Sequence, residues 1–164
     1  MDKEFEKKKK ELLNPFYIEV GAALMDCQTF EYGIAFLLFL LSRLGIKGLD
    51  IKEMSAIMEN ETKKTAGQLI NMLKQYVKVS EDLEEKLKLA LDARNLIIHR
   101  VVVDNIEKLP NPETRNILIK EINSLRSKVR LADKSIRKIV NNLTKELDGF
   151  DEKEFLDEMR YSLN

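Results

Sequence analysis

Apolar residues recur at the spacing of an α-helix along most of this chain. The longest stripe lies between Pro15 and Gly45 and predicts one helix that ends at the glycine. Its members are Phe16, Val20, Ala23, Cys27, Phe30, Ile34, Leu38 and Leu41. Before this stripe, the lysine-rich segment 2–13 is expected to form a short solvated helix or a frayed arm that closes at Asn14-Pro15.

Polar breaks divide the rest of the chain into further helical segments. Asp50 and Ser80 are the expected N-caps of two of them. The motif Pro110-Asn111-Pro112 separates the last two long helices, and Gly149 is expected to end the final one before a short acidic C-terminal helix. The expected helices cover residues 50–58, 65–77, 80–109 and 113–147.

The helical periodicity leaves little room for β-structure. The short run Val101-Val102-Val103 is the one competitor for a strand, and it falls inside an expected helix. The fold class is therefore all-α, an antiparallel helical bundle with short flanking helices. A chain of 164 residues fits one domain, spanning 1–164 with a core of about 16–147. The inner side of the last helix is expected to hold Ile117, Leu118, Ile122, Leu125, Val129, Ile136, Ile139, Val140 and Leu143.

Charge and composition narrow the choice of partners. Basic and acidic residues number 28 each, so the formal net charge is zero and any surface for nucleic acid must be local. Either a strip for RNA phosphates or a solvated helix face would explain the basic residues Lys63, Lys64, Arg126, Lys128, Arg130, Lys134, Arg137 and Lys138. One histidine and one cysteine, Cys27, are too few for a metal centre, so no metal and no cofactor are expected. A single cysteine cannot form an internal disulfide, and this together with the absence of a secretion-type N-terminus favours a cytoplasmic protein.

The segment Tyr32–Leu41 is apolar throughout. Glu31 and Arg43 bound it at roughly half the length that a membrane span requires, so no membrane span is expected. A helix with no polar face must be covered on all sides, and one small bundle seldom achieves this alone. We therefore expect a core helix that also contacts a second subunit.

The most informative residues lie near the end of the helix expected over 80–109. The side chains of Arg94 and His99 suit phosphodiester chemistry, because imidazole can take and return a proton while guanidinium stabilises charge on phosphate oxygens. On a helical wheel Asn95 shares the face of His99, but Arg94 is about 140° away from His99. Arg94 falls on the apolar stripe Leu83, Leu87, Ala90, Arg94, Ile97, Ile98 and Val101.

This position of Arg94 leaves two interpretations open. A buried guanidinium requires a carboxylate partner, because an unpaired buried charge costs several kcal/mol. Glu31, on the stripe of the first long helix, is the leading candidate for that partner. Either Arg94 and Glu31 form a structural ion pair with His99 incidental, or these residues belong to a catalytic site. A single histidine cannot obviously serve as both acid and base, but a twofold homodimer would bring two copies together.

An arginine followed by a polar residue, three further residues and a histidine, on a late helix of a small all-α bundle, resembles the HEPN superfamily. Arg94, Asn95 and His99 match the three positions of that family's motif. The resemblance implies a metal-independent endoribonuclease that acts as a homodimer on RNA, often in toxin-antitoxin, defence or RNA-processing systems. It implies that His99 transfers protons, that Arg94 stabilises the phosphate and that Asn95 orients it.

Other roles fit the same resemblance. Arg100, beside His99, is expected to add a contact to the phosphate of the substrate. Many members of the superfamily have lost catalysis, so a catalytically inactive helical binding or regulatory module is the alternative. The partner would then be an antitoxin, a nucleotide or a nucleotidyltransferase.

Overall fold

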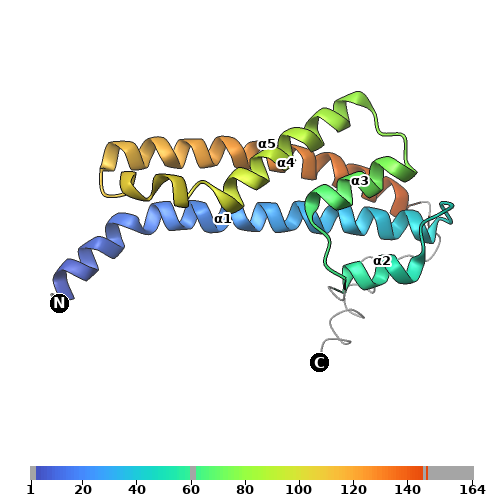
Figure 1. The fold of residues 1–164 in the computed structure, drawn as a ribbon, viewed down its shortest axis with the longest axis horizontal. Helices are drawn as coiled ribbons and strands as arrows, with labels where there is room; N and C mark the ends of the chain where they lie inside the picture. Colours follow the sequence, from blue (N-terminus) through green and yellow to red (C-terminus); the bar gives the residue numbers. More distant parts are fainter. Residues whose placement is uncertain (1–2, 60–61, 146, 148–164) are drawn as a thin grey trace. The chain divides into compact units, whose positions relative to one another are not determined.

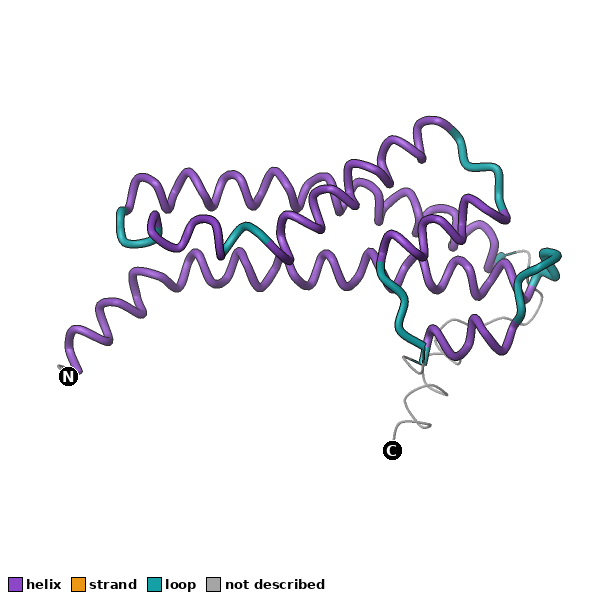
Figure 2. The backbone as a smooth tube through the Cα atoms, in the orientation of Figure 1, coloured by secondary structure: helices purple, strands orange, loops and turns teal. Residues whose placement is uncertain are grey.

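The computed structural model describes residues 3–59, 62–145 and 147. Every regular element in these ranges is helical, and loops join the helices (Figure 1, Figure 2). The elements are α1 (Lys3–Arg43), α2 (Ile51–Met58), α3 (Ala66–Tyr76), α4 (Glu81–His99), the short 3-10 helix η1 (Val103–Lys108) and α5 (Pro112–Thr144). The protein is an all-α helical bundle with short flanking helices, which confirms the fold class expected from the sequence.

The chain divides into two compact units, and each unit combines segments that are far apart in the sequence. The first unit comprises Met1–Thr29 with Glu85–Ala132, and the second comprises Phe30–Glu84 with Asp133–Asn164. The long helices α1, α4 and α5 each contribute to both units. The expectation of one domain over 1–164 stays a prediction.

In the first unit, α4 runs in the opposite direction to α1 and α5 (Figure 1). An ion-pair cluster joins α1 to α5, because Arg126 donates from Nε to Asp26 at 2.8 Å and from Nη1 to Glu19 at 2.5 Å. Buried apolar side chains from these three helices, together with Val101 in the turn after α4, form the core of this unit: Phe16, Ala23, Cys27, Leu87, Ala90, Ala93, Ile97, Val101, Leu118, Ile122, Leu125, Val129 and Ala132.

The second unit contains the apolar segment of α1. Every residue from Ile34 to Ser42 is buried within the single chain, whereas Tyr32 is 39% exposed. The single chain therefore covers this segment from Ile34 onward, and the expected contact with a second subunit stays a prediction. Over Lys7–Arg43 the helix is also long and apolar enough to cross a membrane, with 56% of its most apolar window buried. Core helices of soluble proteins share that length and composition, so the location of the protein stays a prediction.

Local signals in the sequence set several helix ends correctly. Gly45, with φ of +77°, ends α1 in a Schellman motif in which its own N–H bonds to Ser42 and that of Ile46 bonds to Leu41, both at 3.1 Å. Asp50 caps α2 through the backbone N–H of Lys52 at 2.6 Å. Thr65 and Gln68 form a capping box at the start of α3. The expected Gly149 stop and the acidic helix after it lie outside the described residues.

Two expected boundaries are wrong. Pro15 lies inside α1 and does not close an arm. A proline displaces the carbonyl group four residues earlier, here that of Glu11, and this part of α1 is exposed to water that can satisfy it. In addition, α4 ends at His99 and not near Leu109, because the N–H groups of Arg100 and Val101 both bond to the carbonyl oxygen of Leu96 at 2.9 Å. The β-branched run that begins at Val101 disfavours continuation of the helix.

Two expected core residues are also placed incorrectly by the periodicity. Ile98 is 37% exposed and Ile117 is 65% exposed, although both were assigned to inner faces. Each lies directly beside a buried residue, Ile97 and Leu118, respectively. An apolar stripe of this width therefore extends beyond the part of the helix that the neighbouring helices cover.

Candidate functional site

The candidate site lies on the last two turns of α4, within the first unit. Ser80 starts this helix by accepting a hydrogen bond from the N–H of Leu83 at 3.3 Å. Ala93 and Ile97 are buried and anchor the end of the helix in the core. Asn95 and His99 alternate with these anchors and are exposed. The same helix therefore provides both a fixed support and an accessible polar surface.

The side chain of Arg94 brings the three motif residues together. Its Nη1 atom donates to Oδ1 of Asn95 at 3.1 Å and lies 3.4 Å from Nε2 of His99. The wheel geometry requires Arg94 to reach round the helix toward His99, and its long side chain does so. Arg94 itself is half-buried, and both of these contacts are exposed. The guanidinium therefore extends from the edge of the core to the surface.

The contact between Arg94 and His99 has one consistent arrangement of protons. A guanidinium carries only hydrogen-bond donors, so Nε2 of His99 must be the acceptor. In the tautomer that accepts this bond, the ring proton is on Nδ1. This arrangement places an unprotonated ring nitrogen beside a permanent positive charge. When the guanidinium turns from this nitrogen to a phosphate, the freed lone pair can accept a proton from a neighbouring hydroxyl group.

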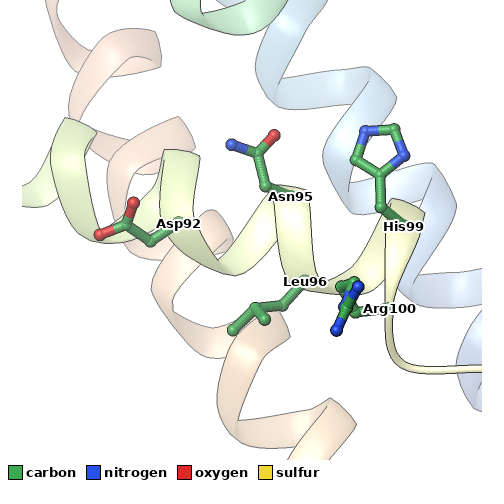
Figure 3. Close-up of a pocket in the computed structure, with 5 residues that line it drawn as sticks. All are labelled: Asp92, Asn95, Leu96, His99 and Arg100. Atoms are coloured by element: carbon green, nitrogen blue, oxygen red, sulfur yellow. The ribbon is translucent and has the colours of Figure 1, made fainter. Parts of the chain in front are cut away.

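A shallow depression of about 560 Å³ lies over this part of α4. It is lined by Asp92, Asn95, Leu96, His99 and Arg100, which are the residues drawn in Figure 3. Asn95 and His99 project from the same side of the helix, whereas Leu96 and Arg100 project from another (Figure 3). The depression is therefore open to solvent and presents both polar and apolar groups to a ligand.

Arg100 lies in the depression but is engaged in an ion pair. Its Nε atom is 2.9 Å from Oδ2 of Asp104, and the two side chains are 66% and 42% exposed. An ion pair this exposed contributes little to stability, so a phosphate can replace the carboxylate at little cost. The expected contact between Arg100 and substrate stays a prediction.

Asp92 also lines the depression, although the sequence motif does not include it. It precedes Asn95 by three positions and His99 by seven, which is the spacing of residues along one face of a helix. That spacing is the signal that could have identified it. A carboxylate in this position can exchange protons, but it also repels a phosphate group.

Two further predictions from the sequence concern Glu31 and a metal site. Glu31 is partly buried on α1 and belongs to the second unit, so its pairing with Arg94 stays a prediction. Within the described ranges, no group of three or more histidine, cysteine, aspartate or glutamate side chains is arranged to hold a metal ion.

One of the basic residues considered for a strip that binds RNA, Arg126 on α5, is not exposed. The side chain of Arg126 is only 16% exposed, and it is bonded to Glu19 and Asp26. The hydrogen bond that Arg126 donates to Asp26 is the main cause of a raised pKa for Arg126, and the charge of Asp26 and the hydrogen bond to Glu19 add to it. Arg126 therefore stabilises the first unit and is not available to RNA.

No protein-family model matches the chain, and searches of curated proteins and of solved structures find no significant match. The fold and the site define the protein as an all-α helical bundle with an exposed arginine-asparagine-histidine cluster. The likeness to the HEPN superfamily stays a resemblance of motif and helix order.

Proposed function

We propose that this chain is a metal-independent endoribonuclease of the HEPN type. The observation that carries the proposal is the contact of one guanidinium, that of Arg94, with both Asn95 and His99 on an exposed surface. These three side chains provide a proton acceptor, a fixed positive charge and a polar orienting group, as cleavage of a phosphodiester requires.

In the proposed reaction, neutral His99 accepts the proton of a ribose 2′-hydroxyl group. The 2′-oxygen forms a bond to phosphorus, and the bond from phosphorus to the 5′-oxygen breaks. Arg94 stabilises the negative charge that gathers on the phosphoryl oxygens, and Asn95 orients the phosphate. A second acid protonates the departing 5′-oxygen. The products are a 2′,3′-cyclic phosphate and a free 5′-hydroxyl group.

The second acid is best supplied by the His99 side chain of another copy of the chain. A homodimer in which two α4 helices lie near the twofold axis would form a composite site from Arg94, Asn95 and His99 of both copies. Exposed apolar side chains beside the cluster support this part of the proposal, since Leu96 is 45% and Ile98 is 37% exposed. The proposed setting is cytoplasmic, in a toxin-antitoxin or defence system with an antitoxin or a nucleotidyltransferase as partner.

One observation favours a catalytically inactive binding or regulatory module instead. Asp92 lines the same depression as His99, and its carboxylate opposes the approach of a phosphodiester. In this alternative the cluster positions α4, and the depression binds a protein partner or a nucleotide.

The deciding experiment is the cleavage of labelled single-stranded RNA by the purified protein in excess EDTA, with His99→Ala as the matched variant. Cleavage by the wild type alone, yielding cyclic phosphate ends, would support the nuclease. Activity that survives in His99→Ala would contradict the catalytic assignment. An absence of cleavage on several RNAs would favour the binding module.

A further inference from the structure

A second depression, of about 490 Å³, lies on α5 within the second unit. It is lined by Asp133, Lys134, Arg137, Lys138, Asn141, Asn142 and Lys145. Four of these side chains are cationic and one is anionic, although the whole chain has no net charge. The positions follow the helical period, so they lie along one face of α5. Positive charge is therefore concentrated here.

The single carboxylate in this set does not oppose an anion. Oδ2 of Asp133 accepts a hydrogen bond from Nε of Arg137 at 2.7 Å. Its other oxygen, Oδ1, is buried, where a β-carbon on Gly33 of α1 would approach it to 3.3 Å. Asp133 is thus turned inward and neutralised by Arg137. Lys134, Lys138 and Lys145 are exposed and provide the outward charge.

The geometry of these lysines fits an extended polyanion. Residues on α5 advance by about 1.5 Å each, so Lys134 lies roughly 15 Å from the end of the helix at Thr144, and Lys145 follows directly in the turn. A single strand of RNA presents several phosphates over that length. The exposed amide groups of Asn141 and Asn142 lie between the lysines and add neutral donors for phosphate or sugar oxygens.

The types of side chain that line this second depression also distinguish among classes of polyanion. None of the seven side chains is apolar or aromatic. A helix that binds a membrane surface inserts apolar side chains beside its basic ones, and none is present in this set. The absence of an aromatic ring in the set likewise predicts contact with the backbone and no stacking on bases.

We propose that this face of α5, Asp133–Lys145, binds the phosphate backbone of single-stranded RNA without sequence preference. The choice of RNA rests on the function proposed above, whereas the location of the surface does not. Binding is carried by Lys134, Lys138 and Lys145, and it requires neither Arg94 nor His99.

The experiment measures the binding of a fluorescent single-stranded RNA by anisotropy over a series of salt concentrations. All proteins carry His99→Ala, so that cleavage cannot alter the RNA. The test variant adds Lys134→Ala, Lys138→Ala and Lys145→Ala. The matched control adds Lys7→Ala, Lys9→Ala and Lys10→Ala, three exposed lysines near the start of α1. Circular dichroism confirms that both variants keep the helical content of the parent.

We expect the test variant to bind about tenfold more weakly at low salt, because it lacks three of the phosphate contacts. Each lost contact also removes about 0.7 from the slope of log K against log salt. The slope should therefore fall by about 2, and the control should change by less than about twofold in affinity. Equal affinities for the test variant and the parent would overturn the proposal. So would a parent protein that binds phosphatidylserine vesicles but not RNA.

The outcomes separate this proposal from the proposed function. Lysine-dependent binding without any cleavage by the wild type would support the α5 surface and contradict the nuclease. Cleavage that depends on His99, together with unchanged binding in the lysine variant, would contradict the α5 surface alone.

Discussion

The guanidinium of Arg94 lies 3.4 Å from Nε2 of His99, although the two residues lie on different sides of an ideal α-helix. The same nitrogen also donates to Asn95 at 3.1 Å. The four rotatable single bonds of the arginine side chain make this reach feasible. All three members of the cluster therefore lie on one helix.

Arg94→Lys should reduce RNA cleavage by about 100-fold while leaving the fold intact. An ammonium group lacks the planar two-nitrogen geometry with which a guanidinium binds phosphate oxygens, and loss of one transition-state donor costs about this much. Since these contacts are exposed, the melting temperature should change by no more than about 2 °C. Initial cleavage rates and thermal unfolding provide the two measurements.

Arg94→Ala tests the alternative in which Arg94 is part of a structural ion pair and has no catalytic role. A melting temperature that falls sharply in Arg94→Ala, with no wild-type cleavage to lose, would identify Arg94 as a structural ion-pair partner. In that case the catalytic role would be abandoned.

Leu96→Glu should convert a homodimer to a monomer and abolish cleavage. Leu96 is 45% exposed in the single chain, so a glutamate there should not unfold it, but a charge within an apolar contact should prevent association. Sedimentation velocity and cleavage assays measure both effects. Ile117→Glu is the control, because Ile117 is also exposed but lies on α5. A wild-type protein that is monomeric and active would exclude the composite site.

Arg126→Ala should lower the free energy of unfolding by about 2 kcal/mol or more. The substitution leaves Asp26 and Glu19, which are 21% and 27% exposed, without their shared cation. Arg130→Ala is the matched control. Its Nε atom is 3.9 Å from Asp26 and its side chain is 68% exposed, so a change below about 0.5 kcal/mol is expected. Urea denaturation measures the free energy of unfolding of both variants. Equal decreases would show that the Arg126 cluster contributes no more stability than the exposed contact of Arg130.

Gly33→Ala and Gly21→Ala should change stability in opposite directions, although both glycines lie inside α1. A β-carbon on Gly21 would meet no atom within 4 Å, so alanine should stabilise the helix by about 0.5–1 kcal/mol. A β-carbon on Gly33 would lie 3.3 Å from Oδ1 of Asp133 and 3.4 Å from Ile136. Overpacking should therefore offset the gain and destabilise the protein by about 1 kcal/mol. Equal stabilisation of both variants in thermal unfolding would show that α5 moves aside freely.

The sequence predicted those features that depend on neighbouring residues along the chain. Helical periodicity identified the segments, and Asp50, Ser80 and Gly45 marked their ends through hydrogen bonds that span only a few residues. It also predicted that Asn95 and His99 share a face, because that follows from helical geometry. Arg94 completed the cluster only through its side-chain conformation, which periodicity does not specify.

The tertiary structure decided what depends on which surfaces are covered. Periodicity could not separate buried Ile97 from exposed Ile98, since both fit the same stripe. Nor could it show that Arg126 is held by Glu19 and Asp26, about a hundred positions earlier, while three lysines of the same helix face outward. The sequence by itself determined an all-α chain and the chemistry of one helix end. Which charges are neutralised and which remain exposed depended on long-range packing, because burial and ion pairing are properties of residues brought together by the fold.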